Sequence, residues 1–177
     1  MKKYLFYIVI ISLLLSSKSF ADCNFKAKLG ENLSSVEKKI ETAQPSINDA
    51  TIIIAHIDDI CPREKFGMAA VEYFFIKEEL VSISLKLIND DKNSASNSGN
   101  LMNYVKKKYG NFEAGANPSS WRGYELWKKS GQTIIYRRYV AGDGVLEEEL
   151  FISSDKYIDT ITDFWSEIEK QMETDGN

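Results

Sequence analysis

Val71-Glu-Tyr-Phe-Phe-Ile-Lys-Glu-Glu-Leu-Val-Ser-Ile-Ser-Leu-Lys-Leu-Ile88 is the stretch of sequence from which the fold can be predicted. Its second half alternates apolar residues at positions 81, 83, 85 and 87 with polar residues, which is typical of a strand with one buried face. Its first half is rich in aromatic and β-branched residues, which suit a pleated, half-buried surface. The charged residues 77–79 between the halves predict a turn, so the stretch is expected to form a β-hairpin.

The pairing of the two strands follows from the position of that turn. If residues 78 and 79 form the loop, Phe74 lies opposite Ile83 and both belong to the core face. Tyr73 and Phe75 then lie on the other face, together with the serines at 82 and 84. The residues expected on the core face of the hairpin are Phe74, Ile76, Val81, Ile83 and Leu85.

Residues 1–21 have the features of a secretory signal peptide. Lys2 and Lys3 precede an apolar run, Leu5–Leu15, that is too short to span a bilayer comfortably. Ser19-Phe-Ala21 offers small residues for a signal peptidase, so we expect cleavage after Ala21. An uncleaved anchor helix is the alternative, and a lipoprotein anchor at Cys23 lacks the small residue that should precede it. The expected location is the periplasm or the medium.

The charge and length of residues 22–177 limit what this part of the chain can be. The signal peptide contains three lysines and no acidic residue, which leaves 19 basic and 26 acidic residues and a net charge of −7. A chain this acidic is a poor binder of nucleic acid, because the phosphate backbone requires a basic patch. No long apolar run follows the signal peptide, so we expect a single soluble domain with no transmembrane segment.

Two cysteines, Cys23 and Cys61, remain after cleavage. In an exported protein an even pair predicts a disulfide, which here closes a loop that contributes about 3–4 kcal/mol in the chain-entropy model. The alternative is a redox-active pair, but the spacing is not that of a C-x-x-C motif.

Helical and strand-like patterns alternate along the rest of the chain. We expect a helix within 30–40 capped by Ser34 or Ser35, a strand at 51–57, a loop at 58–67 and the hairpin. A polar linker at 89–100 then leads to a helix at 101–109, strands at 121–128, 133–140 and 145–152, and a C-terminal helix at 154–173. This order predicts an α+β domain: an antiparallel sheet of about six strands in two helix-plus-meander units, with the C-terminal helix packed on the sheet.

The two units, 22–88 and 98–153, suggest an internal duplication. Glu72-Tyr-Phe and Val81-Ser-Ile83 overlay Glu125-Leu-Trp and Ile134-Ile-Tyr136 without a gap. The alternative is that any two hairpins look alike. The helix-then-meander order is similar to that of outer-membrane assembly lipoproteins and of proteinaceous enzyme inhibitors, but no motif assigns the chain to either group.

Few residues are candidates for catalysis or metal binding. The single histidine, His56, precedes Asp58 and Asp59 in a pattern that suits zinc, but no third ligand stands at a recognised spacing. We therefore expect a locally hydrogen-bonded, structural histidine. Residues 90–94 have alternating oxygen ligands but lack the glycine and closing glutamate of a calcium loop, which favours a solvated linker. No nucleophile or phosphate-loop motif is present, so we expect no cofactor, no metal and no catalytic residue.

The acidic run Glu147-Glu-Glu149 has a structural explanation. With a four-residue turn at 141–144, Arg138 lies opposite Glu147 and Arg137 opposite Glu148 as exposed cross-strand ion pairs. A binding patch is the alternative explanation of the run.

Aromatic residues, at 12% of the chain, give the main indication of function. Trp121 and Trp127 share one face of their predicted strand, and Tyr124 and Leu126 share the other. Exposed Tyr, Trp and Arg side chains are typical of protein-binding hot spots, whereas helices on both faces of the sheet would bury them. We predict an exported, non-catalytic protein-binding or accessory module of inhibitor or immunity type. The alternatives are a small-ligand carrier or hydrolase with a cleft near His56, and a cell-envelope assembly factor. The candidate binding residues are Tyr73, Phe75, Trp121, Tyr124 and Trp127.

Overall fold

The computed structural model of the protein describes residues 23–40 and 46–175, so the expected signal peptide and its cleavage site lie outside the described residues. The strands are β1 (Ser46–Ile47), β2 (Ala50–His56), β3 (Ala69–Ile76), β4 (Glu79–Leu87), β5 (Gly123–Lys129), β6 (Gln132–Val140) and β7 (Leu146–Ser154). The helices are α2 (Leu33–Glu37), α3 (Ile57–Ile60), α4 (Ser94–Asn97), α5 (Asn100–Tyr109) and α6 (Ile158–Asp175), with single 3-10 turns at Pro118–Ser120 and Asp155–Tyr157.

The strands form one antiparallel sheet in the order β1-β2-β3-β4-β7-β6-β5. The two meanders, β2-β3-β4 and β5-β6-β7, therefore meet where β4 pairs with β7. This arrangement confirms the predicted α+β fold and its six main strands, to which the two-residue β1 is added. Three details differ: Asn32 caps α2 in place of Ser34 or Ser35, α3 occupies part of the expected loop at 58–67, and α4 lies in the expected linker.

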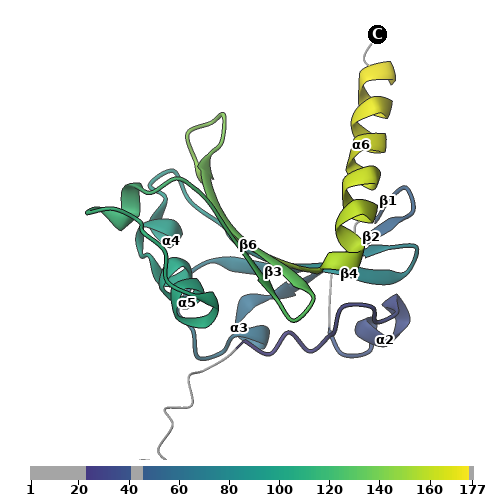
Figure 1. Ribbon diagram of the computed structural model, residues 1–177, viewed down its shortest axis with the longest axis horizontal. Helices are drawn as coiled ribbons and strands as arrows, with labels where there is room; N and C mark the ends of the chain where they lie inside the picture. Colours follow the sequence, from purple (N-terminus) through teal and green to yellow (C-terminus); the bar gives the residue numbers. More distant parts are fainter. Residues whose placement is uncertain (1–22, 41–45, 176–177) are drawn as a thin grey trace, which may run out of the picture.

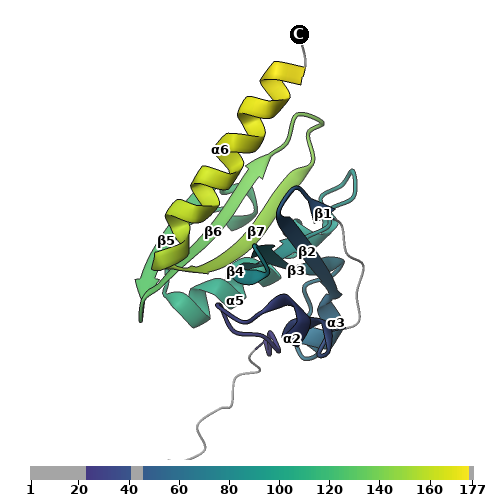
Figure 2. The ribbon, with the colours of Figure 1, turned by 90° about the vertical axis from the view of Figure 1, so that its right-hand side faces the viewer.

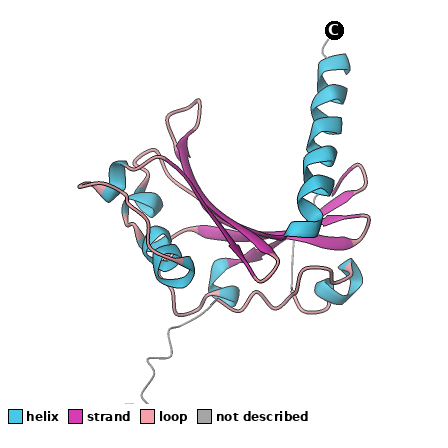
Figure 3. Ribbon diagram, viewed as in Figure 1, coloured by secondary structure: helices cyan, strands magenta, loops and turns pink. Residues whose placement is uncertain are grey.

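The two faces of the sheet are covered unequally. Figures 1 and 3 show α2, α3 and α5 on one side of the sheet, with α6 alone rising from the other. The larger core lies under the three helices and includes Val36 of α2, Ile60 of α3 and Leu101 of α5. The smaller core lies under the first turns of α6 and consists of Ala50, Phe74, Ile76, Val81 and Tyr157. The C-terminal helix is thus packed on the sheet, as expected. Its apolar packing lies in its first turns, and further along Gln171 accepts a hydrogen bond from Asn48 at 3.1 Å.

The predicted register of the central hairpin is wrong. The turn is at Lys77 and Glu78, both with positive φ, and Phe75 pairs with Leu80. The register then shifts, so that Phe74 pairs with Ser82 and Val81 has no partner, as in a β-bulge.

The facing assignments change with the register. Tyr73 and Phe75 lie with Ile83 in the larger core, whereas Phe74 and Ile76 lie under α6. Both sides of this hairpin are buried, including the serines at 82 and 84.

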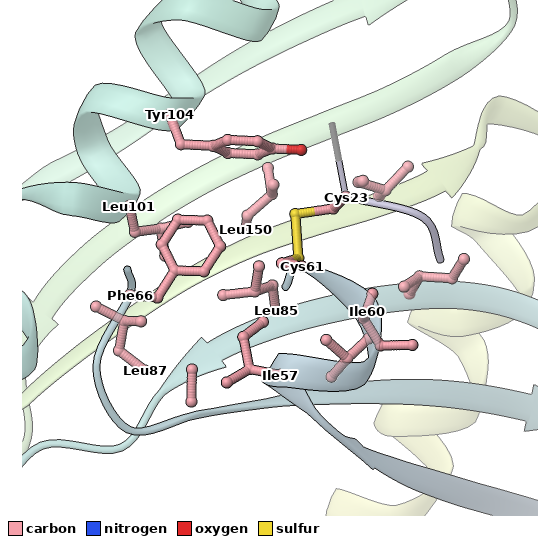
Figure 4. Close-up of a cluster of buried hydrophobic side chains, with 14 of the residues drawn as sticks. Cys23, Ile57, Ile60, Cys61, Phe66, Leu85, Leu87, Leu101, Tyr104 and Leu150 are labelled. Atoms are coloured by element: carbon pink, nitrogen blue, oxygen red, sulfur yellow. A yellow bond between two sulfur atoms is a disulfide. The ribbon is translucent and has the colours of Figure 1, made fainter. Parts of the chain in front are cut away.

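Cys23 and Cys61 form the expected disulfide, with an S–S distance of 2.11 Å. Figure 4 shows it within the larger core, beside Ile60 of α3 and below Tyr104 of α5. Both sulfur-bearing residues are buried. The backbone N–H of Asn24 also donates to the carbonyl of Ile60 at 2.8 Å, so the disulfide and this hydrogen bond together attach the start of the described chain to α3.

Cys61→Ser should lower the free energy of unfolding by about 2–4 kcal/mol, because the denatured chain regains the entropy of an open loop. Urea denaturation without reductant measures the loss. The control is Cys23→Ser/Cys61→Ser, which should lose about as much as the single variant. If reductant leaves the wild-type midpoint unchanged, the bond contributes nothing and this account is wrong.

The predicted internal duplication remains a hypothesis that the sheet supports only in its order of elements. The strand order is symmetric about the β4–β7 pair, so symmetry relates β3 to β6. The gap-free sequence overlay instead places β3 on β5 and β4 on β6. Because β5 is an edge strand and β3 is internal, the overlaid hairpins occupy inequivalent positions.

Candidate functional site

The part of the sheet formed by β5, β6 and β7 has an uncovered face on the side from which α6 rises. Leu126 pairs with Ile135, and Ile135 pairs with Phe151, so three apolar side chains stand in a row across the strands. Phe151 in turn pairs with Ser84 of β4, which joins this row to the surface beside α6. We call this surface, with Tyr124, Leu126, Ile135, Tyr139 and Phe151, the open face.

Several side chains of the open face are accessible to solvent. Tyr124 is 72% exposed, Leu126 is 48% exposed and Tyr139 is 39% exposed, whereas Ile135 and Phe151 are half-buried. Single exposed apolar residues are common, but a contiguous apolar area more often marks an interaction site. Leu126, Ile135 and Phe151 are cross-strand neighbours, and together with the two tyrosines they form such an area.

A row of ion pairs runs beside the apolar row. Arg137 Nη2 lies 2.5 Å from Glu149 Oε2, and Lys86 Nζ lies 2.6 Å from Glu72 Oε2. These residues come from neighbouring strands, because Arg137 pairs with Glu149 and Glu149 with Lys86. Charges held in this way contribute little stability at a surface but give it a fixed electrostatic pattern.

Tyr139, near the end of β6, also makes polar contacts beside the apolar row. Its hydroxyl donates a hydrogen bond to Glu147, and that bond, more than burial, raises the pKa of the tyrosine above its ordinary value. Arg137 also lies over the Tyr139 ring at 5.5 Å. The ring is therefore held in place by a carboxylate and a guanidinium while its face stays partly exposed.

Helix α6 borders the open face with further aromatic side chains. The ring centroids of Phe164 and Trp165 lie 5.5 Å and 5.7 Å from that of Phe74 on β3. Trp165 nevertheless remains 42% exposed, and Met172, two turns further on, is 63% exposed. Figure 2 shows α6 extending beyond the sheet towards its C-terminal end. The apolar stripe of α6 is thus only partly used in packing.

Two of the five predicted binding residues are not accessible. Tyr73 and Phe75 are both 0% exposed in the larger core. Burial raises the pKa of Tyr73 far above its ordinary value, and its hydroxyl donates to the carbonyl of Phe25 at 2.7 Å. These two residues hold the fold together and are removed from the candidate site.

Trp121 and Trp127 lie on the covered side of the sheet, opposite to Tyr124. Trp121 stacks on Tyr136 at 5.6 Å between centroids, and Trp127 lies 6.1 Å from Phe112. The predicted alternation around β5 is therefore confirmed, since the tryptophans share one face and Tyr124 shares the other with Leu126. The structure leaves Tyr124 as the only one of the five on the open face. Ile135, Tyr139 and Phe151 were not among the binding residues predicted from the sequence. Their strands carry apolar residues on both faces, so only the cross-strand pairing places these three together.

The expected exposed charge ladder is partly buried, and its register is shifted by one residue. Arg138 pairs with Glu148 instead of Glu147, and both side chains are 0% exposed. Arg138 donates to the carbonyls of Pro118 at 3.1 Å and Ser96 at 3.0 Å. The Tyr136 hydroxyl donates to Glu148 Oε1 at 2.7 Å, and Arg138 Nε lies 3.4 Å from Glu148 Oε2.

Burial raises the pKa of Glu148 above its ordinary value, against the opposing effects of hydrogen bonds from Ser96 and Tyr136 and the charge of Arg138. This cluster connects β6 and β7 to α4 and to the segment before β5. The cluster is buried on the covered side of the sheet, so it supports the fold and does not form a binding patch.

His56 is an exposed residue at the end of β2. Its side chain accepts a hydrogen bond from the N–H of Asp58 at 3.5 Å and so caps α3. The His56 side chain is 70% exposed and that of Asp58 is 79% exposed. Within residues 23–40 and 46–175, no three His, Cys, Asp or Glu residues are grouped so as to hold a metal ion.

Asp90 belongs to the segment that has a calcium-like pattern of oxygen ligands. Its carboxylate accepts hydrogen bonds from the N–H of Ser94 at 2.8 Å and from the Ser94 hydroxyl at 2.8 Å. These bonds lower the pKa of Asp90 and tie it to the start of α4. Its oxygens are therefore used within the chain.

No protein-family model, curated protein or solved structure matches this chain. In the part of the chain that the structure describes, no helix is both long enough and apolar enough to cross a bilayer.

Proposed function

We propose that this protein is an exported, non-catalytic binding module that contacts another protein through the open face. The observation that supports this proposal is the registered apolar row Leu126–Ile135–Phe151, which is left uncovered while the opposite side of the same strands is packed under α5 and the segment that follows it. An inhibitor or immunity-type role fits a rigid sheet that presents such a surface.

The composition of the open face fits protein recognition. Tyrosine and arginine are enriched at interface hot spots because each combines a large contact area with hydrogen-bonding groups. Tyr124, Tyr139 and Arg137 supply these groups around the apolar row. The ion pairs beside the row restrict the orientation in which a partner can dock, because a partner charge is repelled where it meets a charge of the same sign.

The disulfide supports an oxidising compartment, and the periplasm is the location we propose. A cell-envelope assembly factor would use the same surface in the same compartment, so the identity of the partner separates the two roles. A ligand-binding or hydrolytic role at His56 has no comparable support, because the side chains of His56 and Asp58 lie largely in solvent, 70% and 79% exposed.

Leu126→Arg should weaken capture of the partner by about tenfold or more, because it places an unpaired charge at the exposed, edge-strand end of the apolar row. The matched control is Val140→Arg, which alters another exposed apolar residue of the sheet, 52% exposed and outside the open face. Both variants should melt close to the wild type.

The measurement is quantitative pull-down of one identified partner from envelope extract, followed by a binding isotherm with the purified partner. The proposal is overturned if Leu126→Arg binds this partner as tightly as the wild type. It is also overturned if Val140→Arg loses binding to the same extent.

A further inference from the structure

A cavity lies on the covered side of the sheet, away from the open face. It has a volume of about 500 Å³ and is bounded by the segment 25–29, the end of α5 and the turn between β5 and β6. Pockets that hold small molecules have volumes of about 300–1,000 Å³. The cavity is therefore large enough for a small ligand.

Three interactions fix the N-terminal wall of this pocket. The disulfide at Cys23 holds one end, and the N–H of Gly30 donates to the carbonyl of Leu80 at 2.8 Å at the other. Between them, the buried hydroxyl of Tyr73 donates to the carbonyl of Phe25 at 2.7 Å. A loop tied at both ends and in the middle forms a preformed wall, which lowers the entropy lost when a ligand binds.

The floor of the pocket is apolar. Ile83 of β4 and Ile152 of β7 lie at its base, with exposed fractions of only 4% and 7%, and Tyr109 closes one side. Phe25 and Leu29 line the opposite side. An apolar chain bound here would be removed from water and would contact residues of the larger core.

The rim of the pocket is basic, in a chain whose overall charge is acidic. Lys28, Lys108 and Lys156 line it, and none of the described residues that line it is acidic. Lys108 donates to the Tyr104 hydroxyl at 3.0 Å, and Lys156 lies 3.5 Å from Glu79. Lys28 has no ion-pair partner within the described residues. The rim therefore keeps a positive charge beside an apolar floor.

We propose that this pocket binds an amphipathic anion, that is, an apolar chain that ends in a single carboxylate or phosphate group. The chain would occupy the floor between Ile83 and Ile152, and the anionic group would lie at the rim beside Lys28. Ser130 also lines the pocket, and its hydroxyl can donate to an anionic group there, whereas the Ser154 hydroxyl already donates to the carbonyl of Gly131 at 3.3 Å. A ligand of this kind matches both the apolar floor and the basic rim.

The test is isothermal titration calorimetry on the disulfide-bonded protein with four ten-carbon amphiphiles below their micelle concentrations. Decanoate and decyl phosphate should each bind with one-to-one stoichiometry. Decanol and decyltrimethylammonium should bind roughly tenfold more weakly or not at all, because they lack the negative charge. The ratio between decanoate and decyl phosphate identifies the preferred headgroup.

Two variants locate the site. Ala27→Phe fills the pocket from its wall and should abolish binding, whereas Ala141→Phe, in the turn between β6 and β7, should not change it. Lys28→Glu reverses the charge at the rim and should weaken decanoate binding by about fivefold or more. Lys170→Glu, an exposed change of the same charge on α6, should leave binding as in the wild type.

Equal affinity for the anionic and cationic amphiphiles overturns the proposal. So does wild-type affinity in Lys28→Glu, or equal weakening in Lys28→Glu and Lys170→Glu. Circular dichroism verifies the fold of Ala27→Phe, and Lys28→Glu needs no change in the core. None of these variants alters the open face, so the result is independent of the proposed protein-binding function.

Discussion

Replacement of Arg138 by leucine should lower the free energy of unfolding by about 3–5 kcal/mol, because it leaves the buried carboxylate of Glu148 without its cation. The matched control is the adjacent residue on the other face of β6. Arg137 forms the same kind of cross-strand pair, with Glu149, but only one of the two side chains is buried: Glu149 is 8% exposed and Arg137 is 48% exposed. Arg137→Leu should therefore cost less than Arg138→Leu, about 1–2 kcal/mol.

The size of the expected loss follows from the surroundings of Arg138. Its side chain and that of Glu148 are both 0% exposed, and Arg138 also donates to two backbone carbonyls, those of Ser96 and Pro118. Leucine can fill part of the space but leaves these buried acceptors without a donor. The loss therefore combines an unpaired charge with two unsatisfied carbonyls.

The pH dependence gives a second readout. Burial raises the pKa of Glu148 in the folded protein, so the folded state binds more protons than the unfolded state at pH values between the ordinary and the raised pKa. Stability from this group is present at low pH and is lost as the pH rises through that interval. Without Arg138 the pKa of Glu148 rises further, and the deficit of Arg138→Leu should grow with pH.

Urea denaturation between pH 4 and pH 8 measures both effects. Adding Glu148→Gln to Arg138→Leu should restore part of the stability and flatten the pH dependence, because it removes the buried charge. A deficit below about 1 kcal/mol, or one that is constant with pH, would show that Glu148 is not a buried, charged partner of Arg138.

The order of strands and helices could be predicted because the apolar periods in this chain are long and regular. The turn residues Ser130-Gly131 and the glycine-rich turn at 141–144 bounded β6 to within one residue, and Gly110 marked the end of α5. The alternation around β5 also placed Tyr124 and Leu126 on the face opposite to Trp121 and Trp127. What the pattern could not show is which faces the helices leave uncovered, because that depends on contacts distant in sequence.

Both errors in register come from turns that the sequence does not mark. The turn at Lys77 and Glu78 has positive φ at both positions, a geometry usually supplied by Asn and Gly. The loop between β6 and β7 spans five residues, closed by a hydrogen bond between Ala141 N–H and the Val145 carbonyl, where four were expected. A shift of one residue changes every cross-strand partner, which is why Arg138 was assigned to Glu147 and to an exposed ladder.

Phe75→Ala should destabilise the protein by about 3–5 kcal/mol, whereas Tyr124→Ala should change its stability by no more than about 0.5 kcal/mol. Phe75 is 0% exposed and lies opposite Leu80, itself 0% exposed, in the larger core. Removing its ring takes apolar surface out of the core and leaves a cavity that closely packed neighbours cannot fill. Tyr124 is 72% exposed on the open face, so its ring contributes little to folding.

The two variants separate stability from binding. Tyr124→Ala should melt like the wild type and bind the partner more weakly, whereas folded Phe75→Ala should bind with unchanged affinity despite its lower stability. Equilibrium denaturation with an unchanged m-value, followed by titration at a temperature where both variants are folded, measures each effect. If Phe75→Ala costs less than about 1 kcal/mol and weakens binding, Phe75 belongs to a surface. The register that places it in the larger core is then wrong.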